Sequence, residues 1–436
     1  MEPDEPDPLT TPLRPRAAPA VLRSFSIRNT FRAFSYRNYR IFYFGQLISL
    51  IGSWMTTTAE GWLVYQLTGS KALLGIVVAA ATAPMLILST VGGWLADNYP
   101  KRSILVCTQL GSMCVALTLA FLVWQEWITT WHLITLALVS GVIMAFDMPA
   151  RQAFVIELTS KRDLVNAISL NSAAFNGARI IGPSVAGVLM AKLGIAMCFF
   201  VDGISFIAVI AGLLMLRIVP VDAPRRTASV LSETLSGFRY VLQSPLLLRV
   251  FGLFAVVGIF GWSYSVLMPA IARDTLHLDE EGYGLLLGAN GVGALCGALI
   301  IAATGHVFSP RRLAFSGLWL FCVMIIGFAL TSTFWLACLY LAVSGLGLIL
   351  FFSSANSAVQ LSVRDEMRGR VMGIWALVFG GVVPLGSLQA GAMAQYFGAT
   401  ATLIIGAIIC TFAAVVTLNY ARRDPNQAPA YLGTGD

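Results

Sequence analysis

Charged side chains inside apolar segments are the residues of this sequence that could do chemistry. Glu60 lies toward the end of one long apolar run, and Arg179 lies near the middle of another. If these runs cross a bilayer, an unpaired charge within them costs several kcal/mol, so each group needs a partner or water. We therefore expect Glu60 and Arg179 to face one central cavity, either in direct contact or joined through water.

A carboxyl and a guanidinium in one cavity could couple proton movement to substrate movement. The base would keep the Glu60 carboxylate ionised until a substrate or a conformational change separates the two groups, after which the carboxylate could take up a proton. The alternative interpretation is a carboxyl that bonds to a neighbouring helix for structure alone.

Polar side chains recur at helical spacing beside both charges. Because polar groups on one face of a membrane helix should face protein or water, the two stripes favour a cavity wall. The stripes comprise Gln46, Ser49, Ser53, Thr57 and Glu60 in the first run and Ser172, Asn176, Arg179 and Pro183 in the second.

Asp147 and Arg151 are a second pair of opposite charges. They are four residues apart, so they can pair on one face of a helix, and Pro149 between them should kink that helix. A local structural ion pair is one interpretation. In the other, Asp147 exchanges protons with the cavity as the release step, and it is also a second candidate partner for Arg179.

A polar loop at Gly92–Arg102 separates two apolar runs. Gly92 and Gly93 should let two helices approach closely. Asp97 lies too near the end of its run to be a buried charge, and Lys101 and Arg102 mark the side that faces the cytoplasm.

The composition indicates a membrane protein. Of 436 residues, 57% are hydrophobic and 11% are charged, which excludes a soluble globular domain. We expect an all-α, polytopic protein with twelve transmembrane helices in two six-helix halves. The predicted spans are 41–67, 72–96, 103–124, 132–156, 164–190 and 196–217, followed by 249–271, 282–304, 313–332, 335–360, 370–395 and 399–420.

Basic residues orient these spans. With both termini inside, all Lys and Arg fall in cytoplasmic segments except Lys71, Lys192, Arg273 and the intramembrane Arg179. The net charge of +7 therefore reports topology and gives no reason to invoke nucleic acid. We expect a disordered cytoplasmic tail at 1–30, a cytoplasmic linker with an amphipathic helix at 218–248 between halves 31–217 and 249–420, and a second cytoplasmic tail at 421–436.

The second half repeats small residues of the first at a constant offset of 204 positions. Gly182, Pro183 and Gly187 should let their helix bend and pack closely. The repeat pairs Gly177, Ala186, Gly187 and Gly194 with Gly381, Ala390, Gly391 and Gly398.

Catalytic and cofactor motifs are missing from the sequence. Its 7 cysteines and 3 histidines are scattered without metal-ligand spacing. We find no nucleophile–base pair and no phosphate-binding glycine loop. We therefore expect no enzyme activity, no cofactor and no metal.

Several motifs resemble the major facilitator superfamily over residues 31–420. The loop Gly93–Arg102 resembles its signature loop between helices 2 and 3, with Asn98 and Pro100 departing from the usual Arg and Gly. One bacterial branch, which includes the enterobactin exporter and macrolide efflux proteins, is similar at further motifs. These are Phe44–Gly52, Gly61–Ser70, Pro149–Ala153, Asn166–Ser172, Arg179–Pro183 and Arg368–Gly373.

The resemblance implies export of a small, often amphipathic molecule such as a drug or siderophore, driven by proton antiport with alternating access. It also implies that Asp97 faces the start of span eleven near Arg370, as part of a cytoplasmic latch. Lys101 and Arg102 could reach Glu157 or Asp163. The alternative function is an uncoupled facilitator or lipid flippase. We expect a monomer in the bacterial cytoplasmic membrane, with a small molecule, protons and lipid as its partners.

Overall fold

The computed structural model describes residues 31–160, 162–216, 230–304 and 307–423, and the described elements are helices. The first half of the chain supplies one group of helices, each following an apolar run of the sequence. They are η1 (Arg32–Ser35), α2 (Arg37–Thr68), α3 (Lys71–Asn98), α4 (Lys101–Trp124), α5 (Thr130–Leu158), α6 (Leu164–Leu193) and α7 (Ile195–Met215).

The second half supplies the other group. One of its spans, Pro245–Thr275, is interrupted by a π-helical turn at Val257–Gly261 and ends in another at Ile271–Thr275. The elements are α8 (Val230–Gln243), α9 (Pro245–Val256), η2 (Val257–Gly261), α10 (Ser263–Ala270), η3 (Ile271–Thr275), α11 (Glu280–Thr304), α12 (Pro310–Leu330), α13 (Phe334–Ser362), α14 (Asp365–Phe397) and α15 (Ala399–Arg423).

Ten helices of the described chain are long and apolar enough to cross a membrane. The other two predicted spans correspond to α2 and α6, which are 32 and 30 residues long. These are the helices that carry the polar stripes, and the stripes lower their hydropathy. The all-α, polytopic fold is confirmed, and the helices are consistent with twelve spans.

The predicted tail at 1–30, residues 218–229 of the predicted linker and residues 424–436 of the second predicted tail lie outside the described residues. Within the rest of the linker, α8 forms a helix as expected. Its Leu235, Phe238 and Leu242 are exposed, whereas Val241 is buried against the second half. The domain boundaries otherwise stay predictions.

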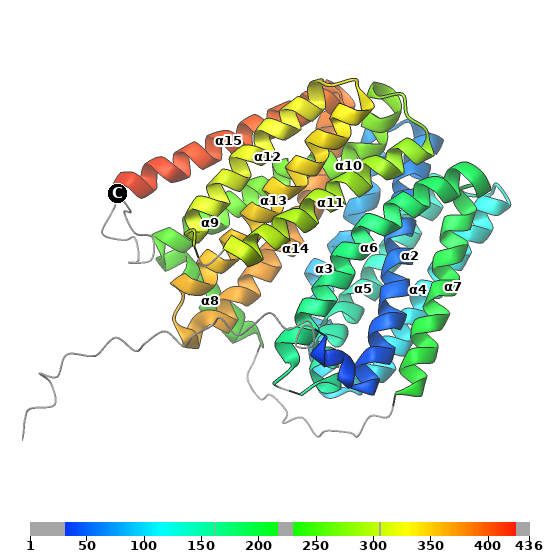
Figure 1. Ribbon diagram of the computed structural model, residues 1–436, viewed down its shortest axis with the longest axis horizontal. Coiled ribbons are helices and arrows are strands. Elements are labelled where there is room, and N and C mark those ends of the chain that lie inside the picture. Colours follow the sequence, from blue (N-terminus) through cyan, green and yellow to red (C-terminus); the bar gives the residue numbers. More distant parts are fainter. Residues whose placement is uncertain (1–30, 161, 217–229, 305–306, 424–436) are drawn as a thin grey trace, which may run out of the picture.

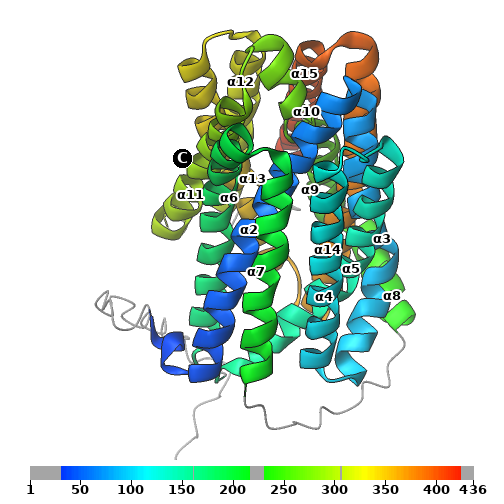
Figure 2. The same ribbon diagram turned by 90° about the vertical axis from the view of Figure 1, so that its right-hand side faces the viewer.

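The helices gather into two bundles that follow the two halves of the chain. In Figure 1, α4, α6 and α7 lie on the right and α12, α13 and α15 on the left. Figure 2 views the first bundle, in which α2 and α7 run side by side. Helices α3 and α6 of the first bundle pack against α14 and α11 of the second.

Two glycine contacts join the bundles in equivalent ways. A Cβ atom on Gly187 of α6 would lie 3.1 Å from the Cα of Gly284 in α11. A Cβ on Gly391, its repeat partner in α14, would lie 3.1 Å from the Cα of Gly75 in α3. Because only glycine lets the backbones come this close, the repeat in the sequence marks the two joints between the halves.

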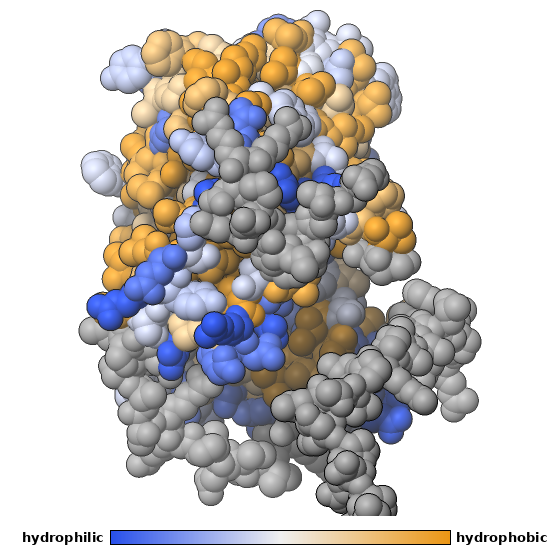
Figure 3. All heavy atoms as spheres, turned by 90° about the vertical axis from the view of Figure 1, so that its left-hand side faces the viewer, coloured by the Kyte–Doolittle hydropathy of each residue, from blue (hydrophilic) through white to orange (hydrophobic). Residues whose placement is uncertain are grey.

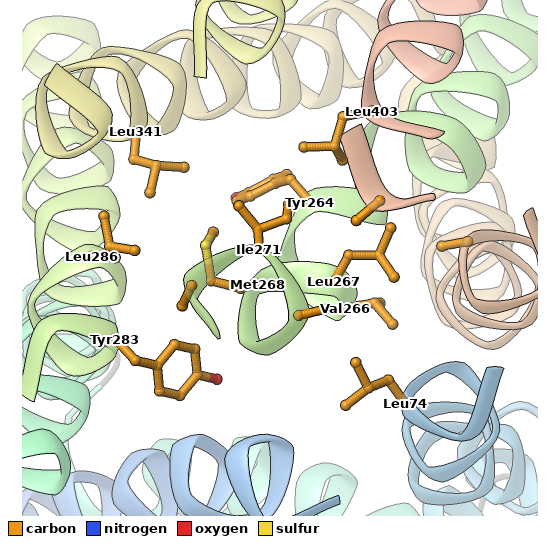
Figure 4. Close-up of a cluster of buried hydrophobic side chains, with 14 of the residues drawn as sticks. Leu74, Tyr264, Val266, Leu267, Met268, Ile271, Tyr283, Leu286, Leu341 and Leu403 are labelled. Atoms are coloured by element: carbon orange, nitrogen blue, oxygen red, sulfur yellow. The ribbon is translucent and has the colours of Figure 1, made fainter. Parts of the chain in front are cut away.

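Apolar side chains fill the interior and also cover the outside. Figure 4 shows part of the largest buried cluster, in which Met268 of the interrupted span points toward the side of Leu286 in α11, and Tyr264 lies on the side of Leu341 and Leu403. Figure 3 shows that the second-half face is mainly apolar in its upper part, with hydrophilic residues lower down. An apolar exterior suits contact with lipid tails.

Candidate functional site

Arg179 lies at the junction of the two bundles, where its partners are neutral. Its Nη2 donates a hydrogen bond to Oδ1 of Asn290 in α11, at 2.9 Å. Its guanidinium also lies 5.9 Å from the ring centroid of Trp54 in α2, within the range of a cation–π interaction. Neither of these neighbours supplies a carboxylate to balance the positive charge of the guanidinium.

Asn290 is positioned for this contact by its own helix neighbours. It is 4% exposed, and its Nδ2 donates to the carbonyl oxygen of Leu341 in α13, at 3.2 Å. The hydroxyl of Tyr264 donates to the same Oδ1 at 3.4 Å. With its amide nitrogen engaged on α13, Asn290 presents its oxygen to Arg179.

Glu60 of α2 is partly buried and makes no ion pair within the described chain. The predicted direct contact with Arg179 is not found. The adjacent Gly61 lies against the second bundle, where an added Cβ would be 3.3 Å from the Tyr283 hydroxyl. Glu60 thus lies on the part of α2 that approaches the second half.

The polar stripes are not uniform cavity walls. In α2, Gln46 and Ser49 are buried at 7% and 2% exposure, whereas Thr57 is exposed and donates to the carbonyl oxygen of Ser53. In α6, Ser172 is exposed. The α6 side chains bond to their own helix, because Ser172 donates to Ile168 O and Asn176 donates to Ser172 O.

Asp147 belongs to a separate buried cluster in the first bundle. It is 3% exposed and accepts hydrogen bonds from Arg151 Nε at 2.8 Å, from Thr108 at 2.7 Å and from Gln109 at 2.8 Å. The structure therefore corrects the idea that Asp147 partners Arg179. The pairing with Arg151, expected from the spacing of the two residues, is present.

Sequence reasoning did not single out Asp202, which is 3% exposed in α7. Its carboxylate accepts hydrogen bonds from Thr56 at 2.7 Å and from Ser205 at 3.3 Å. A Cβ on Gly52 would overlap the carboxylate, so this glycine makes room for it. The signal was an acid in the middle of an otherwise apolar span.

Polar bridges join the bundles at the end of the molecule that contains the α2–α3 turn, which we call the Gly69 end. Asp274 of η3 accepts a hydrogen bond from the Tyr65 hydroxyl and forms an ion pair with Lys71 at 3.4 Å. Trp62 Nε1 donates to Glu280 of α11 at 3.2 Å.

Gln395 of α14 adds to the same end. Its Oε1 accepts hydrogen bonds from the backbone N–H groups of Lys71 and Ala72, at 3.2 and 3.4 Å. These groups lie in the first turn of α3, where N–H groups have no partner within the helix. A side chain of the second bundle therefore caps a helix of the first.

At the opposite end, which contains the α3–α4 turn and which we call the Pro100 end, the predicted latch is not assembled. Asp97 is exposed, and Arg370 contacts Met367 of its own helix. Lys101 forms an ion pair with Glu157 at 2.7 Å, which is one of the two acids expected.

Other predicted contacts at the Pro100 end take different partners. Asp163 pairs with Arg32 at 3.1 Å instead of with a base of the loop. Arg102 donates to the backbone oxygens of Leu214 and Leu216 at the end of α7. These interactions stay within the first bundle.

The predicted packing glycines also differ among themselves. Gly92 lies against the Ala145 backbone, whereas nothing lies within 4 Å of a Cβ on Gly93, so Gly93 makes no close helix contact here. Gly182 lies against Ile51 of α2, where a Cβ would be 2.9 Å from the carbonyl oxygen. Pro183 is inside α6 and approaches Gly284.

Known proteins match almost the whole chain. Residues 28–430 match the model of a family described as transmembrane secretion effector. The staphyloferrin A transporter of Staphylococcus aureus is 26% identical over 373 residues, covering 84% of this chain and 92% of that protein. The multidrug efflux pump Tap of Mycolicibacterium fortuitum is 28% identical over 376 residues, covering 83% and 90%. The enterobactin exporter EntS of Shigella boydii is 26% identical over 412 residues, covering 90% and 95%.

Solved structures share the fold at low sequence identity. A bacterial homologue of the human lysosomal transporter Spinster, in an inward-facing and unoccupied conformation, has a TM-score of 0.72 at 12% identity, covering 93% of this chain and 99% of that one. The nucleoside transporter NupG has a TM-score of 0.66 at 16% identity, covering 88% and 98%.

Proposed function

The chain belongs to the transmembrane secretion effector family of the major facilitator superfamily and is a multi-pass membrane transporter rather than an enzyme; from this premise we propose that it exports a small, amphipathic molecule across the bacterial cytoplasmic membrane in exchange for protons. Relatives named as a staphyloferrin A transporter, a multidrug efflux pump and an enterobactin exporter support export of small molecules. The sequence and the structure support the finer steps as follows.

The position of Glu60, together with its lack of an ion pair among the described residues, is the observation that supports proton exchange. This carboxyl lies on α2 where that helix approaches the second bundle, and no described residue forms an ion pair with it. A carboxyl without a charged partner can take up a proton without breaking an ion pair, whereas Asp147 is bonded to Arg151 and to two further donors. Glu60 is therefore the proposed proton carrier, and Asp147 the centre of a structural cluster.

Alternating access is the proposed way in which the proton and the substrate cross. In one access state of such a transporter, one end of the two bundles is closed and the other is open. The bridges at the Gly69 end and the unassembled latch at the Pro100 end match such a state. The distribution of Lys and Arg supports a cytoplasmic location for the Pro100 end and for both termini. With this orientation, the conformation is open toward the cytoplasm. Because a single chain supplies both halves of the site, we expect a monomer.

The test is gradient-driven transport by the purified chain in proteoliposomes. A panel of cationic, neutral and anionic fluorescent probes identifies a transported compound, which is then followed with and without an imposed pH gradient. We expect Glu60→Gln to abolish the response to the gradient and to leave probe binding measurable, because an amide cannot ionise. Glu281→Gln, at an exposed acid in the first turn of α11, is the matched control.

The alternative is an uncoupled carrier, either a facilitator or a lipid flippase, in which the charged groups are structural. That function predicts transport at the same rate with and without the gradient. A gradient response that persists in full in Glu60→Gln would exclude Glu60 as the coupling group.

A further inference from the structure

Arg179 and Glu60 differ in whether the side chain can become neutral. A glutamate can take up a proton, whereas a guanidinium stays protonated at any physiological pH. Its described neighbours supply an amide oxygen from Asn290, the hydroxyl of Tyr264 and the face of an aromatic ring from Trp54. None of these contacts brings a negative charge, and Arg179 forms no ion pair among the described residues.

The guanidinium also has donors left for a ligand. It carries five N–H groups; the bond to Asn290 uses Nη2, and a further hydrogen bond joins the guanidinium to Tyr264. The side chain is only partly buried, and Ser172, seven residues earlier on the same face of α6, is exposed. Among the described residues, the guanidinium contacts Asn290, Trp54 and Tyr264, and its other N–H groups are left for an approaching group.

We propose that Arg179 recognises an anionic group, a carboxylate, on the molecule that this transporter carries. A carboxylate can accept two parallel N–H bonds from a guanidinium, a geometry that a neutral group does not match. Asn290 and Tyr264 act as positioning residues, because Asn290 holds the guanidinium and both belong to the second bundle. This inference rests on the proposed transport function, because it concerns the transported molecule. Its test measures binding and does not depend on proton coupling.

The bridge from α6 to α11 gives the site a link to conformation. Arg179 belongs to the first bundle and Asn290 to the second, so a carboxylate that draws the guanidinium away from Asn290 weakens a contact between the halves. Binding of an anion would thus favour a change in their arrangement. A ligand shifts such an equilibrium only through its differential affinity for the two states, and Arg179 supplies that difference.

The experiment measures binding of two probes of similar size to the full chain in nanodiscs. Pyrenebutyrate carries a carboxylate and pyrenebutanol carries a hydroxyl on the same apolar body. Energy transfer from tryptophan to pyrene reports binding. We expect the wild-type chain to bind pyrenebutyrate at least about tenfold more tightly than pyrenebutanol, where tenfold corresponds to about 1.4 kcal/mol.

Three variants separate recognition from a structural role. Arg179→Gln keeps a donor for Asn290 and should lose the preference for pyrenebutyrate while it binds pyrenebutanol as before. Arg179→Lys keeps the charge and should restore part of the preference. Lys192→Gln, which removes an exposed charge in the last turn of the same helix, should change neither affinity.

Several results would overturn the proposal. They are equal affinities for the two probes in the wild-type chain, no measurable binding of pyrenebutyrate, or a preference that survives in Arg179→Gln. Failure of the proposed function has a different signature. In that case the binding preference is present and depends on Arg179, but proteoliposomes show no gradient-driven transport of any probe.

Discussion

At the Gly69 end of the molecule the two halves are held together, whereas at the Pro100 end the acid expected to join them is exposed. Asp274 binds Tyr65 and Lys71 at the first end, and Gly75 packs on Gly391 beside them. At the second end Asp97 is exposed. The contacts that close the two bundles at the Gly69 end are therefore separate from any contacts at the Pro100 end.

The difference lies in the kind of contact as well as in its presence. The Gly69 end combines backbone packing at glycines, which tolerates no side chain, with polar bridges that water can replace. Packing should therefore contribute more to closure of this end than the bridges do. The three predictions that follow test this order with spin-label distances in a cysteine-free background, between Gln66 and Tyr396 at the Gly69 end and between Asn98 and Glu366 at the Pro100 end.

Gly75→Leu should have the largest effect. A Cβ there would overlap the Ser387 backbone, so the leucine forces α3 and α14 apart at a cost of about 1 to 3 kcal/mol. We expect the Gln66–Tyr396 distance to increase and the Asn98–Glu366 distance to decrease. Gly252→Leu is the control, because nothing lies within 4 Å of a Cβ at Gly252. An unchanged distance distribution in Gly75→Leu would show that this joint does not determine closure.

Asp274→Asn should have an intermediate effect. The amide can still accept a hydrogen bond from Tyr65, but it loses the attraction to the ammonium group of Lys71. Because this ion pair is partly exposed, we expect a loss of about 1 kcal/mol, which corresponds to about a fivefold shift between access states. Double electron–electron resonance at the Gly69 end measures the shift. Glu281→Gln should leave the distances as they are, and a shift as large as that in Gly75→Leu would reverse the proposed order.

Asp97→Asn should have the smallest effect on the conformation described here. The side chain is exposed, so the thermal stability of the purified chain should change by less than about 0.5 kcal/mol. If Asp97 latches the Pro100 end in the opposite state, the variant should lose that state and its short Asn98–Glu366 distances. Wild-type populations of both states in Asp97→Asn would remove the latch role from this residue.

Local patterns in the sequence were enough to predict the helices and some of their side-chain contacts. The apolar runs gave the spans to within a few residues because a bilayer of fixed thickness requires each one. The contact between Asp147 and Arg151 followed from spacing along one helix, and the close packing at Gly187 from the small residues of its helix.

The tertiary structure decided which residues meet across the two halves. Arg179 and Asn290 are separated by 111 positions in the sequence, and Tyr65 and Asp274 by 209. The charge on Arg179 required some partner, but charge alone cannot choose between a carboxylate on α2 and an amide on α11. That choice depends on how two bundles, each already folded, lie against one another. The sequence predicted Glu60 as the partner, in direct contact or through water, whereas the direct hydrogen bond of Arg179 in the structure goes to Asn290. Asp202 shows the same limit, because its surroundings of Thr56 and Gly52 come from a helix about 150 positions earlier.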